Sequence, residues 1–265
     1  MAGRPTLVYS HANGFSGACY RKLYTYLDDD FEILYIDRFG HDPRYPVSDG
    51  WSRLAVQLQD FNAARAHGPV IGVGHSLGGY LNVLAAVQRP ELFSAIILLD
   101  SPLLGPWTGT ALQLVKRLEF ADRVTPARIT LERRRRWANL DAVYQHFQVR
   151  APFRYFDPNC LRDYAHFGTV AAAGGVQLAF DPDVECRIYW TIPHDLARQM
   201  QGLKLPAGFI GGRQSLELRR AGLGIMRRYF HVNLIDGSHL FPFEHPRSAA
   251  AAVRGMWQLL KGKSL

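Results

Sequence analysis

Residues 70–79 read Val-Ile-Gly-Val-Gly-His-Ser-Leu-Gly-Gly, and this stretch decides the fold. An apolar run, 70–74, leads into a glycine-flanked serine with the pattern G-x-S-x-G, and a helical pattern over 80–88 follows. A nucleophile at such a strand–turn–helix junction needs small neighbours, because its backbone angles are strained. The turn lifts the hydroxyl clear of the sheet and aims the positive end of the helix at the reacting carbon. The segment therefore predicts that Ser76 is a nucleophile.

Strands and helices alternate on both sides of this serine. Apolar, β-branched runs that predict strands occur at 6–10, 31–37, 70–74, 95–99, 207–210 and 231–235. Helical spacing of apolar residues occurs between them at 51–66 and 216–228, and after them at 248–260. Continuous apolar strands are typical of a sheet buried on both faces. The sequence therefore predicts an α/β fold with a mostly parallel sheet flanked by helices.

The alternation stops between residues 105 and 201. This stretch has mostly helical patterns, and we expect helices at about 107–122, 126–147, 159–173 and 194–201, broken at several prolines. A helical insertion inside an α/β domain is typical of a cap over a site. The predicted organisation is a core of residues 1–104 and 202–265 with a cap of residues 105–201.

A serine hydroxyl needs a base to react at neutral pH, and ten histidines compete for that role. His239 directly follows the last predicted strand, where a loop can return to the sheet edge beside Ser76. His75 is adjacent to the serine on a sharp turn, so we interpret it as a packing residue. His245 is better placed to begin the last helix. The sequence therefore predicts that His239 is the base.

The loop after the first strand reads Ser-His-Ala-Asn-Gly-Phe at residues 10–15. A glycine-bearing loop at this edge can offer a backbone N–H group to an oxyanion. We expect the N–H groups of Phe15 and Leu77 to form the oxyanion hole, with Gly14 as the next choice for the first donor. The alternative is that the loop is a simple turn.

Four segments together resemble the α/β-hydrolase superfamily. They are His-Ala-Asn-Gly-Phe (11–15), Asp-Arg-Phe-Gly-His (37–41), Gly-His-Ser-Leu-Gly-Gly (74–79) and Gly-Ser-His-Leu-Phe-Pro-Phe-Glu-His-Pro (237–246). The sequence is most similar to esterase- and lipase-like serine hydrolases with a helical cap. The resemblance implies a sheet of about six strands and a triad in the order serine, acid, histidine.

The position of the third triad residue, the acid, departs from the pattern of the superfamily. The superfamily usually carries it after the strand that follows the cap, as G-x-x-D, but here that position is Ser215. Some relatives carry the acid one strand beyond the nucleophile, which corresponds to Asp100. A carboxylate at the end of an apolar strand is costly to bury unless it is paired, and His239 is a fitting partner. We therefore favour Asp100, with Glu217 as the alternative acid; a plain turn cap is the other interpretation of Asp100.

The formal net charge is +8, which raises the question of a polyanionic partner. The excess is local, because residues 105–156 hold ten Lys and Arg against four Asp and Glu, whereas residues 157–200 hold three against six. Arg133 to Arg136 form a run that would spread around a helix, so a solvated face is the plain interpretation. Attraction of an anionic substrate toward the cap is the alternative. We expect a small-molecule ester substrate and no nucleic acid.

Composition and motif spacing argue against a membrane protein, a secreted protein and a metal- or cofactor-dependent protein. Hydrophobic residues make up 48% of the 265 residues, and no apolar run approaches the roughly 20 residues of a membrane span. The first residues lack a signal-peptide pattern, so we expect a cytoplasmic protein without stable membrane insertion. No metal-ligand spacing or cofactor motif is present, so neither a metal nor a cofactor is expected. The oligomeric state is left open.

The predicted function is hydrolysis of carboxylic esters through an acyl-enzyme. A serine at the elbow, where dehalogenases and epoxide hydrolases of this superfamily carry aspartate, argues for acyl transfer. A C–C bond or thioester hydrolase with the same triad is an alternative. A hydrolase fold that has lost its acid and only binds is another.

Overall fold

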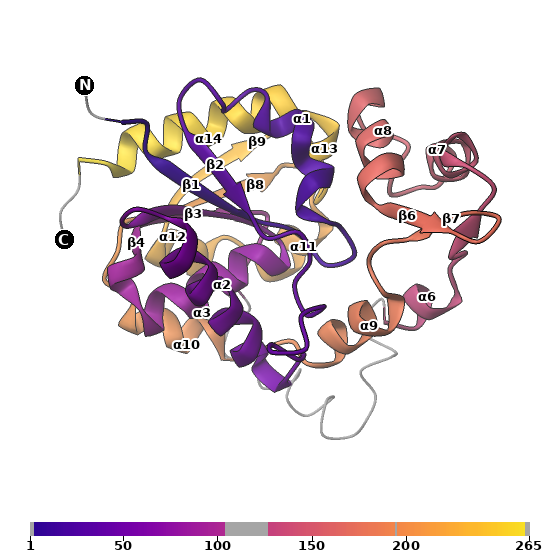
Figure 1. Ribbon diagram of the computed structural model, residues 1–265. Coiled ribbons are helices and arrows are strands. Elements are labelled where there is room, and N and C mark those ends of the chain that lie inside the picture. The colour runs from indigo at the N-terminus through magenta and orange to yellow at the C-terminus, as the bar shows by residue number, and fades with distance from the viewer. Residues whose placement is uncertain (1–2, 104–126, 194, 263–265) are drawn as a thin grey trace.

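The computed structural model describes residues 3–103, 127–193 and 195–262. A six-stranded, fully parallel sheet forms its centre, in the order β2-β1-β3-β4-β8-β9. This confirms the predicted fold, since Figure 1 shows the sheet between two layers of helices. The strands are β1 (Thr6–Ser10), β2 (Glu32–Tyr35), β3 (Val70–His75), β4 (Phe93–Leu99), β8 (Ala207–Gly212) and β9 (His231–Ile235).

The two faces of the sheet bury separate apolar clusters. On one face pack α1 (Arg21–Tyr24) and α14 (Pro246–Leu260), which contribute Leu23 and Val253 to the first cluster. On the other face pack α2 (Ser52–Arg65), α3 (Leu77–Gln88) and α12 (Gly224–Tyr229). Every residue of β3 is buried, as expected for a central strand covered on both faces.

Short elements complete the core. The helix expected over 216–228 divides into α11 (Leu216–Ala221) and α12, because Gly222 adopts a φ of 76° and ends α11. The remaining elements of the core and of its junction with the cap are η1 (Gly17–Tyr20), η2 (Asp49–Trp51), η3 (Pro90–Leu92), α10 (Leu196–Gln199), η4 (Met200–Gly202) and α13 (Phe241–Glu244).

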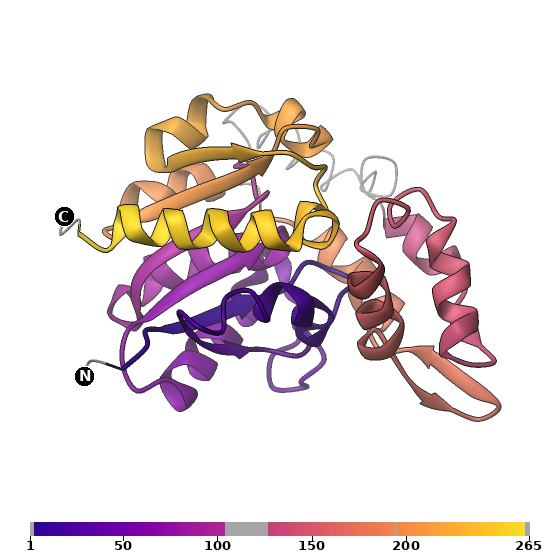
Figure 2. The same cartoon turned by 90° about the horizontal axis from the view of Figure 1, so that it is seen from above.

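The segment that we expected to form the cap lies beside the carboxyl ends of the strands (Figures 1 and 2). It combines helices with a small antiparallel sheet in the order β5-β7-β6, which the sequence did not predict. Its described elements are α6 (Ala127–Glu132), β5 (Arg136–Trp137), α7 (Leu140–Gln148), α8 (Pro158–Phe167), β6 (Thr169–Ala172), β7 (Gly175–Leu178) and α9 (Pro182–Trp190).

Two expected cap helices were wrong in extent. The helix over 126–147 stops at Glu132, and a new helix begins after Asn139, whose side chain accepts a hydrogen bond from the N–H of Ala142. The helix over 159–173 stops at Phe167, because the chain turns at Gly174 to pair β6 with β7. The helix expected over 107–122 lies outside the described residues.

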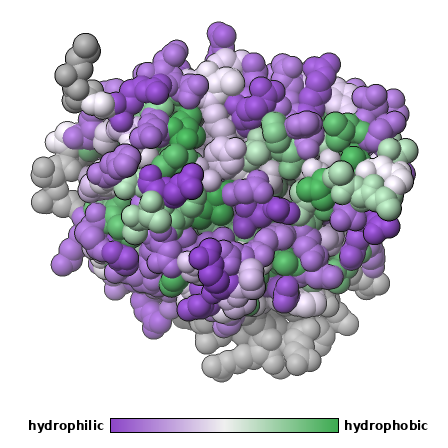
Figure 3. Space-filling model, viewed as in Figure 1, coloured by the Kyte–Doolittle hydropathy of each residue, from purple (hydrophilic) through white to green (hydrophobic). Residues whose placement is uncertain are grey.

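The surface seen in Figure 3 is mostly hydrophilic, with hydrophobic residues in small separate patches. Within the described ranges, no helix combines the length and apolar character that a membrane crossing requires.

Candidate active site

Ser76 occupies the turn between β3 and α3. Its backbone angles are φ 51° and ψ −114°, a conformation that costs free energy for a residue with a side chain. Its N–H group donates to the carbonyl of Leu99 on the neighbouring strand at 3.0 Å. The surrounding fold therefore holds the strained turn that the sequence predicts.

The glycines after the serine let other backbone segments approach closely. A Cβ atom on Gly78 would lie 2.0 Å from the carbonyl oxygen of Ser10 at the end of β1. A Cβ atom on Gly79 would lie 2.1 Å from Oγ of Ser101. These contacts bring the ends of β1 and β4 against the first turn of α3.

Replacement of Gly78 by alanine is expected to lower the free energy of unfolding by about 1–3 kcal/mol, because the new methyl group meets a backbone oxygen that cannot rotate away. Gly255→Ala is the matched control. Gly255 is exposed within α14 with nothing within 4 Å of its added Cβ, so alanine there should stabilise by up to about 1 kcal/mol. Urea unfolding midpoints measure both. Equal midpoints for Gly78→Ala and the wild type would contradict the tight contact.

A chain of hydrogen bonds joins the three residues predicted as the triad. His239 Nε2 lies 3.1 Å from Oγ of Ser76, and His239 Nδ1 lies 2.7 Å from Oδ2 of Asp100. Asp100 is fully buried, while the His239 side chain is 23% exposed. The geometry fits a neutral imidazole whose Nδ1–H donates to the carboxylate and whose Nε2 faces the serine.

Asp100 is held by groups from the strand that follows the cap. The N–H of Gly212 donates to Oδ1 at 2.8 Å, and the hydroxyl of Ser215 donates to Oδ2 at 2.5 Å. Ser215, at the position where the resemblance led us to expect the acid, thus donates a hydrogen bond to Asp100, the residue that we favoured instead. Together with His239, these donors give the buried carboxylate three hydrogen-bond partners.

Glu217 lies nearby but outside hydrogen-bond distance of the histidine. Its Oε2 is 3.9 Å from Nδ1 of His239, and its side chain is 48% exposed. Asp100, Glu217 and His239 could together offer three ligand atoms to a metal ion. However, the hydrogen bonds of Asp100 already account for this cluster, so it needs no ion to explain it.

The pKa of His239 lies above its usual value of 6.5. Burial lowers this pKa, but the hydrogen bond to Asp100 and the negative charges of Asp100, Glu217 and Glu244 outweigh burial and raise it. The protonated imidazole is therefore stabilised next to Asp100, as a base that must briefly carry a proton requires.

His75 does more than pack. Its Nε2–H donates to the backbone carbonyl of His239 at 2.8 Å, and its Nδ1 accepts from the hydroxyl of Tyr20 at 2.7 Å. Burial lowers the pKa of His75 to about 3, with the nearby His239 adding to the effect, so the ring is neutral. His75 therefore connects the loop that carries His239 to Tyr20 in η1.

The loop after β1 forms a tight turn at the mouth of the site. The N–H of Phe15 donates to the carbonyl of Ala12 at 3.3 Å, around Gly14 with φ 80°. Phe15 N–H is thus engaged in closing the turn. In the described part of the chain no group accepts a hydrogen bond from the backbone N–H of Asn13. Leu77 begins α3, so its N–H has no partner within the helix.

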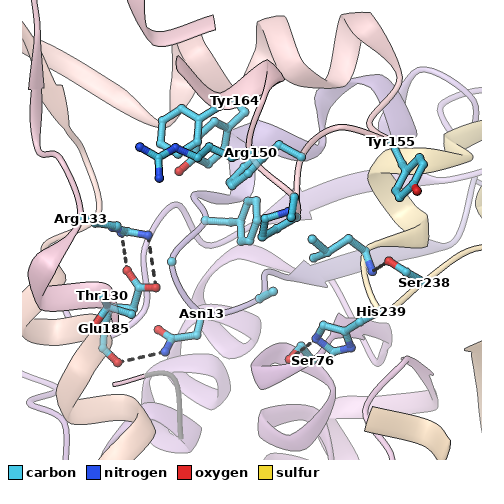
Figure 4. Close-up of a pocket in the computed structure, with 18 of the residues that line it drawn as sticks. Asn13, Ser76, Thr130, Arg133, Arg150, Tyr155, Tyr164, Glu185, Ser238 and His239 are labelled. Carbon is cyan, nitrogen blue, oxygen red and sulfur yellow. Dashed lines mark hydrogen bonds and ion pairs between the residues drawn. The ribbon is translucent and has the colours of Figure 1, made fainter. Parts of the chain in front are cut away.

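A cavity of about 720 Å³ lies between the cap and the turn that carries Ser76, and both Ser76 and His239 line it. Its cap side carries an aromatic wall, formed by Phe147, Phe153, Tyr155 and Tyr164. Figure 4 shows that the buried Glu185 and its ion-pair partner Arg133 also face this cavity. Sequence reasoning named Arg133 only as part of a charged run and missed Glu185, because no local pattern joins residues 52 positions apart.

The model of the alpha/beta hydrolase family matches residues 7–253. The chain belongs to this family. It is 33% identical over 106 residues to the uncharacterized hydrolase YugF of Bacillus subtilis, covering 37% of each chain. It is 28% identical over 108 residues to a probable esterase of Oryza sativa subsp. japonica, covering 37% of this chain and 38% of that protein. The match therefore spans little more than a third of these relatives.

The crystal structure of E-2-(acetamidomethylene)succinate hydrolase is similar over nearly the whole chain. Its TM-score is 0.79 at 20% identity, and the alignment covers 97% of this chain and 92% of that one. This likeness supports the fold alone.

Proposed function

We propose that this family member is a serine hydrolase that cleaves carboxylic esters through an acyl-enzyme. The observation that carries the proposal is the chain of hydrogen bonds from Ser76 through His239 to Asp100. In this proposal Ser76 is the nucleophile, His239 is the base and Asp100 orients the imidazole.

The proposed reaction has two halves. Ser76 Oγ attacks the ester carbonyl while Nε2 of His239 takes its proton, and the resulting imidazolium returns that proton to the leaving alcohol. A water molecule activated by the same histidine then hydrolyses the acyl-enzyme. Asp100 stabilises the imidazolium in both halves.

The oxyanion is assigned to two backbone donors, one at the start of α3 and one in the loop after β1. Leu77 N–H, at the start of α3, keeps the role expected from the sequence. For the second donor, the geometry favours Asn13 N–H over Phe15 N–H, since the Phe15 group already donates to Ala12.

The alternative of a binding protein without catalysis finds no support in this geometry, because a carboxylate lies within hydrogen-bond distance of His239. A thioester or C–C bond hydrolase would use the same three residues. Rates on 4-nitrophenyl esters, acyl-CoA thioesters and vinylogous diketones separate these chemistries.

Labelling with a fluorophosphonate tests the proposed nucleophile. The folded protein should gain one phosphonyl group, and peptide mass spectrometry should place it on Ser76. A heat-denatured sample and a His239→Ala variant, which lacks the base, should label far more slowly. A folded sample that does not label at Ser76 would overturn the proposal.

The rate should fall in acid as His239 becomes protonated. Because the pKa of His239 is raised, kcat/KM for an uncharged ester should already start to decrease above pH 6.5 when the pH is lowered. At pH values well below this pKa, kcat/KM should decrease tenfold for each pH unit. Glu217→Gln removes a charge that raises this pKa, so the acid limb should move to lower pH. Glu91→Gln, at an exposed carboxylate on η3, is the control. An unchanged or higher midpoint in Glu217→Gln would contradict this prediction.

A further inference from the structure

The cap side of the cavity carries an exposed arginine that has no acidic partner among the described residues. Arg150, which follows α7, lines the cavity, and its side chain forms no ion pair or hydrogen bond with any residue in the described ranges. Burial lowers the pKa of His146, and the positive charges of Arg150 and Arg134 lower it further. The guanidinium groups of Arg150 and Arg134 therefore both lie close enough to His146 to affect its charge.

Arg133, also on the cap side of the cavity, has hydrogen-bond partners for only some of its side-chain nitrogens. Arg133 reaches the buried Glu185 with both terminal nitrogens, but its Nε is buried and has no hydrogen-bond partner in the described chain. Burial raises the pKa of Glu185 to about 7, although the charge of Arg133 opposes this rise. The pair thus leaves one buried donor of Arg133, its Nε, without a partner in the described chain.

Four carboxylates also line the cavity, Glu132 and Glu185 from the cap and Glu217 and Glu244 from the core, and each already interacts with another residue of the chain. Glu244 accepts hydrogen bonds from the N–H and the hydroxyl of Ser238, and Glu217 lies beside Ser215 and His239. In Figure 4, Arg133 and Arg150 lie toward the cap, whereas Ser76 and His239 lie at the other end of the drawn residues. The cap side of the cavity therefore carries the Arg133–Glu185 ion pair and Arg150, which is unpaired among the described residues, whereas Glu217 and Glu244 lie near the triad.

We propose that the cavity selects esters whose acyl chain ends in a free carboxylate, and that Arg150 and Arg133 bind that carboxylate while Ser76 faces the ester. This inference rests on the proposed function and names its substrate class. A guanidinium presents paired N–H donors that match a carboxylate, and the aromatic wall suits the hydrocarbon between the two ends. The cavity volume of about 720 Å³ is enough for such a molecule.

Two substrates of equal chain length test the selection. The mono-4-nitrophenyl ester of glutaric acid carries the free carboxylate, and 4-nitrophenyl valerate replaces it with a methyl group. We expect kcat/KM to favour the anionic ester by about tenfold or more, because binding it supplies the missing partner of Arg150. Added salt should reduce this ratio.

Arg150→Gln should lower the ratio of the two kcat/KM values by about tenfold. The matched control is Arg162→Gln, on α8, because Arg162 is an exposed cap arginine that does not line the cavity. The paired change Arg133→Gln with Glu185→Gln should also lower the ratio, and it leaves no uncompensated buried charge. A ratio near one in the wild type, or one that Arg150→Gln leaves unchanged, would overturn the inference.

A binding measurement separates this inference from the proposed chemistry. Glutarate is titrated calorimetrically into Ser76→Ala, with and without Arg150→Gln. Binding that Arg150→Gln weakens about tenfold supports the carboxylate site even if no ester is turned over. If valerate esters are hydrolysed but glutarate does not bind and its ester is not preferred, the carboxylate site is wrong and the serine hydrolase stands.

Discussion

Replacing Ser76 with alanine should lower kcat for 4-nitrophenyl esters by about 10⁴-fold or more, because the acyl-enzyme can no longer form. The hydroxyl is the atom that His239 Nε2 faces at 3.1 Å, and no other group takes its place at the turn. Alanine keeps the backbone at φ 51° and removes a single atom, so the fold should persist.

Three measurements make this result specific. Circular dichroism and the urea midpoint should match the wild type, fluorophosphonate labelling should disappear, and stopped-flow assays should lose the burst of nitrophenol. Ser248→Ala, at an exposed serine of α14, should keep full activity. Residual turnover above about a hundredth of the wild-type rate would show that another group performs the chemistry.

The core could be predicted because its signals are local. The bounds expected for the strand over 231–235 agree with β9, and β3 differs from its prediction by one residue. Ser76 and His239 could be predicted as candidates because each stands in a short pattern after a strand. Asp100 was favoured because a carboxylate that ends an apolar strand needs a partner, and the structure gives it three.

The cap could not be predicted to the same extent, because its boundaries depend on distant pairing. Arginines favour helix, yet Arg136 and Trp137 pair with β7 some 40 positions later. Pro182 was expected to break the helical stretch, whereas it begins α9 after the cap residue Asp181, and Pro158 begins α8 one residue before the expected start at 159. An aspartate before each proline was the signal that could have revealed α9.

Replacing Asp100 with asparagine is expected to lower kcat by about 10⁴-fold, whereas Glu217→Gln should cost less than about tenfold. An amide cannot accept hydrogen bonds at both of its ends. The N–H of Gly212, the hydroxyl of Ser215 and Nδ1–H of His239 would therefore compete for one oxygen. His239 would lose the partner that fixes its tautomer and stabilises its charged form.

The comparison of these two variants decides between the acids that the sequence left open. Both are measured as kcat at the pH optimum on the same uncharged ester, with urea midpoints to confirm folding. If Glu217→Gln were the more damaging change while Asp100→Asn kept most of the activity, Glu217 would be the acid and Asp100 a structural residue.

Moving the carboxylate from position 100 to position 215 tests by gain of function whether His239 needs an acidic partner. The hydroxyl of Ser215 already touches the Asp100 oxygen that His239 contacts, so a carboxylate at position 215 should lie close to the imidazole. Adding Ser215→Asp to Asp100→Asn should therefore recover about tenfold or more of the lost kcat. Ser248→Asp added to Asp100→Asn, which introduces an exposed carboxylate on α14, should recover nothing. Equal recovery in the two double variants would show that general charge, and not a partner for His239, limits the reaction.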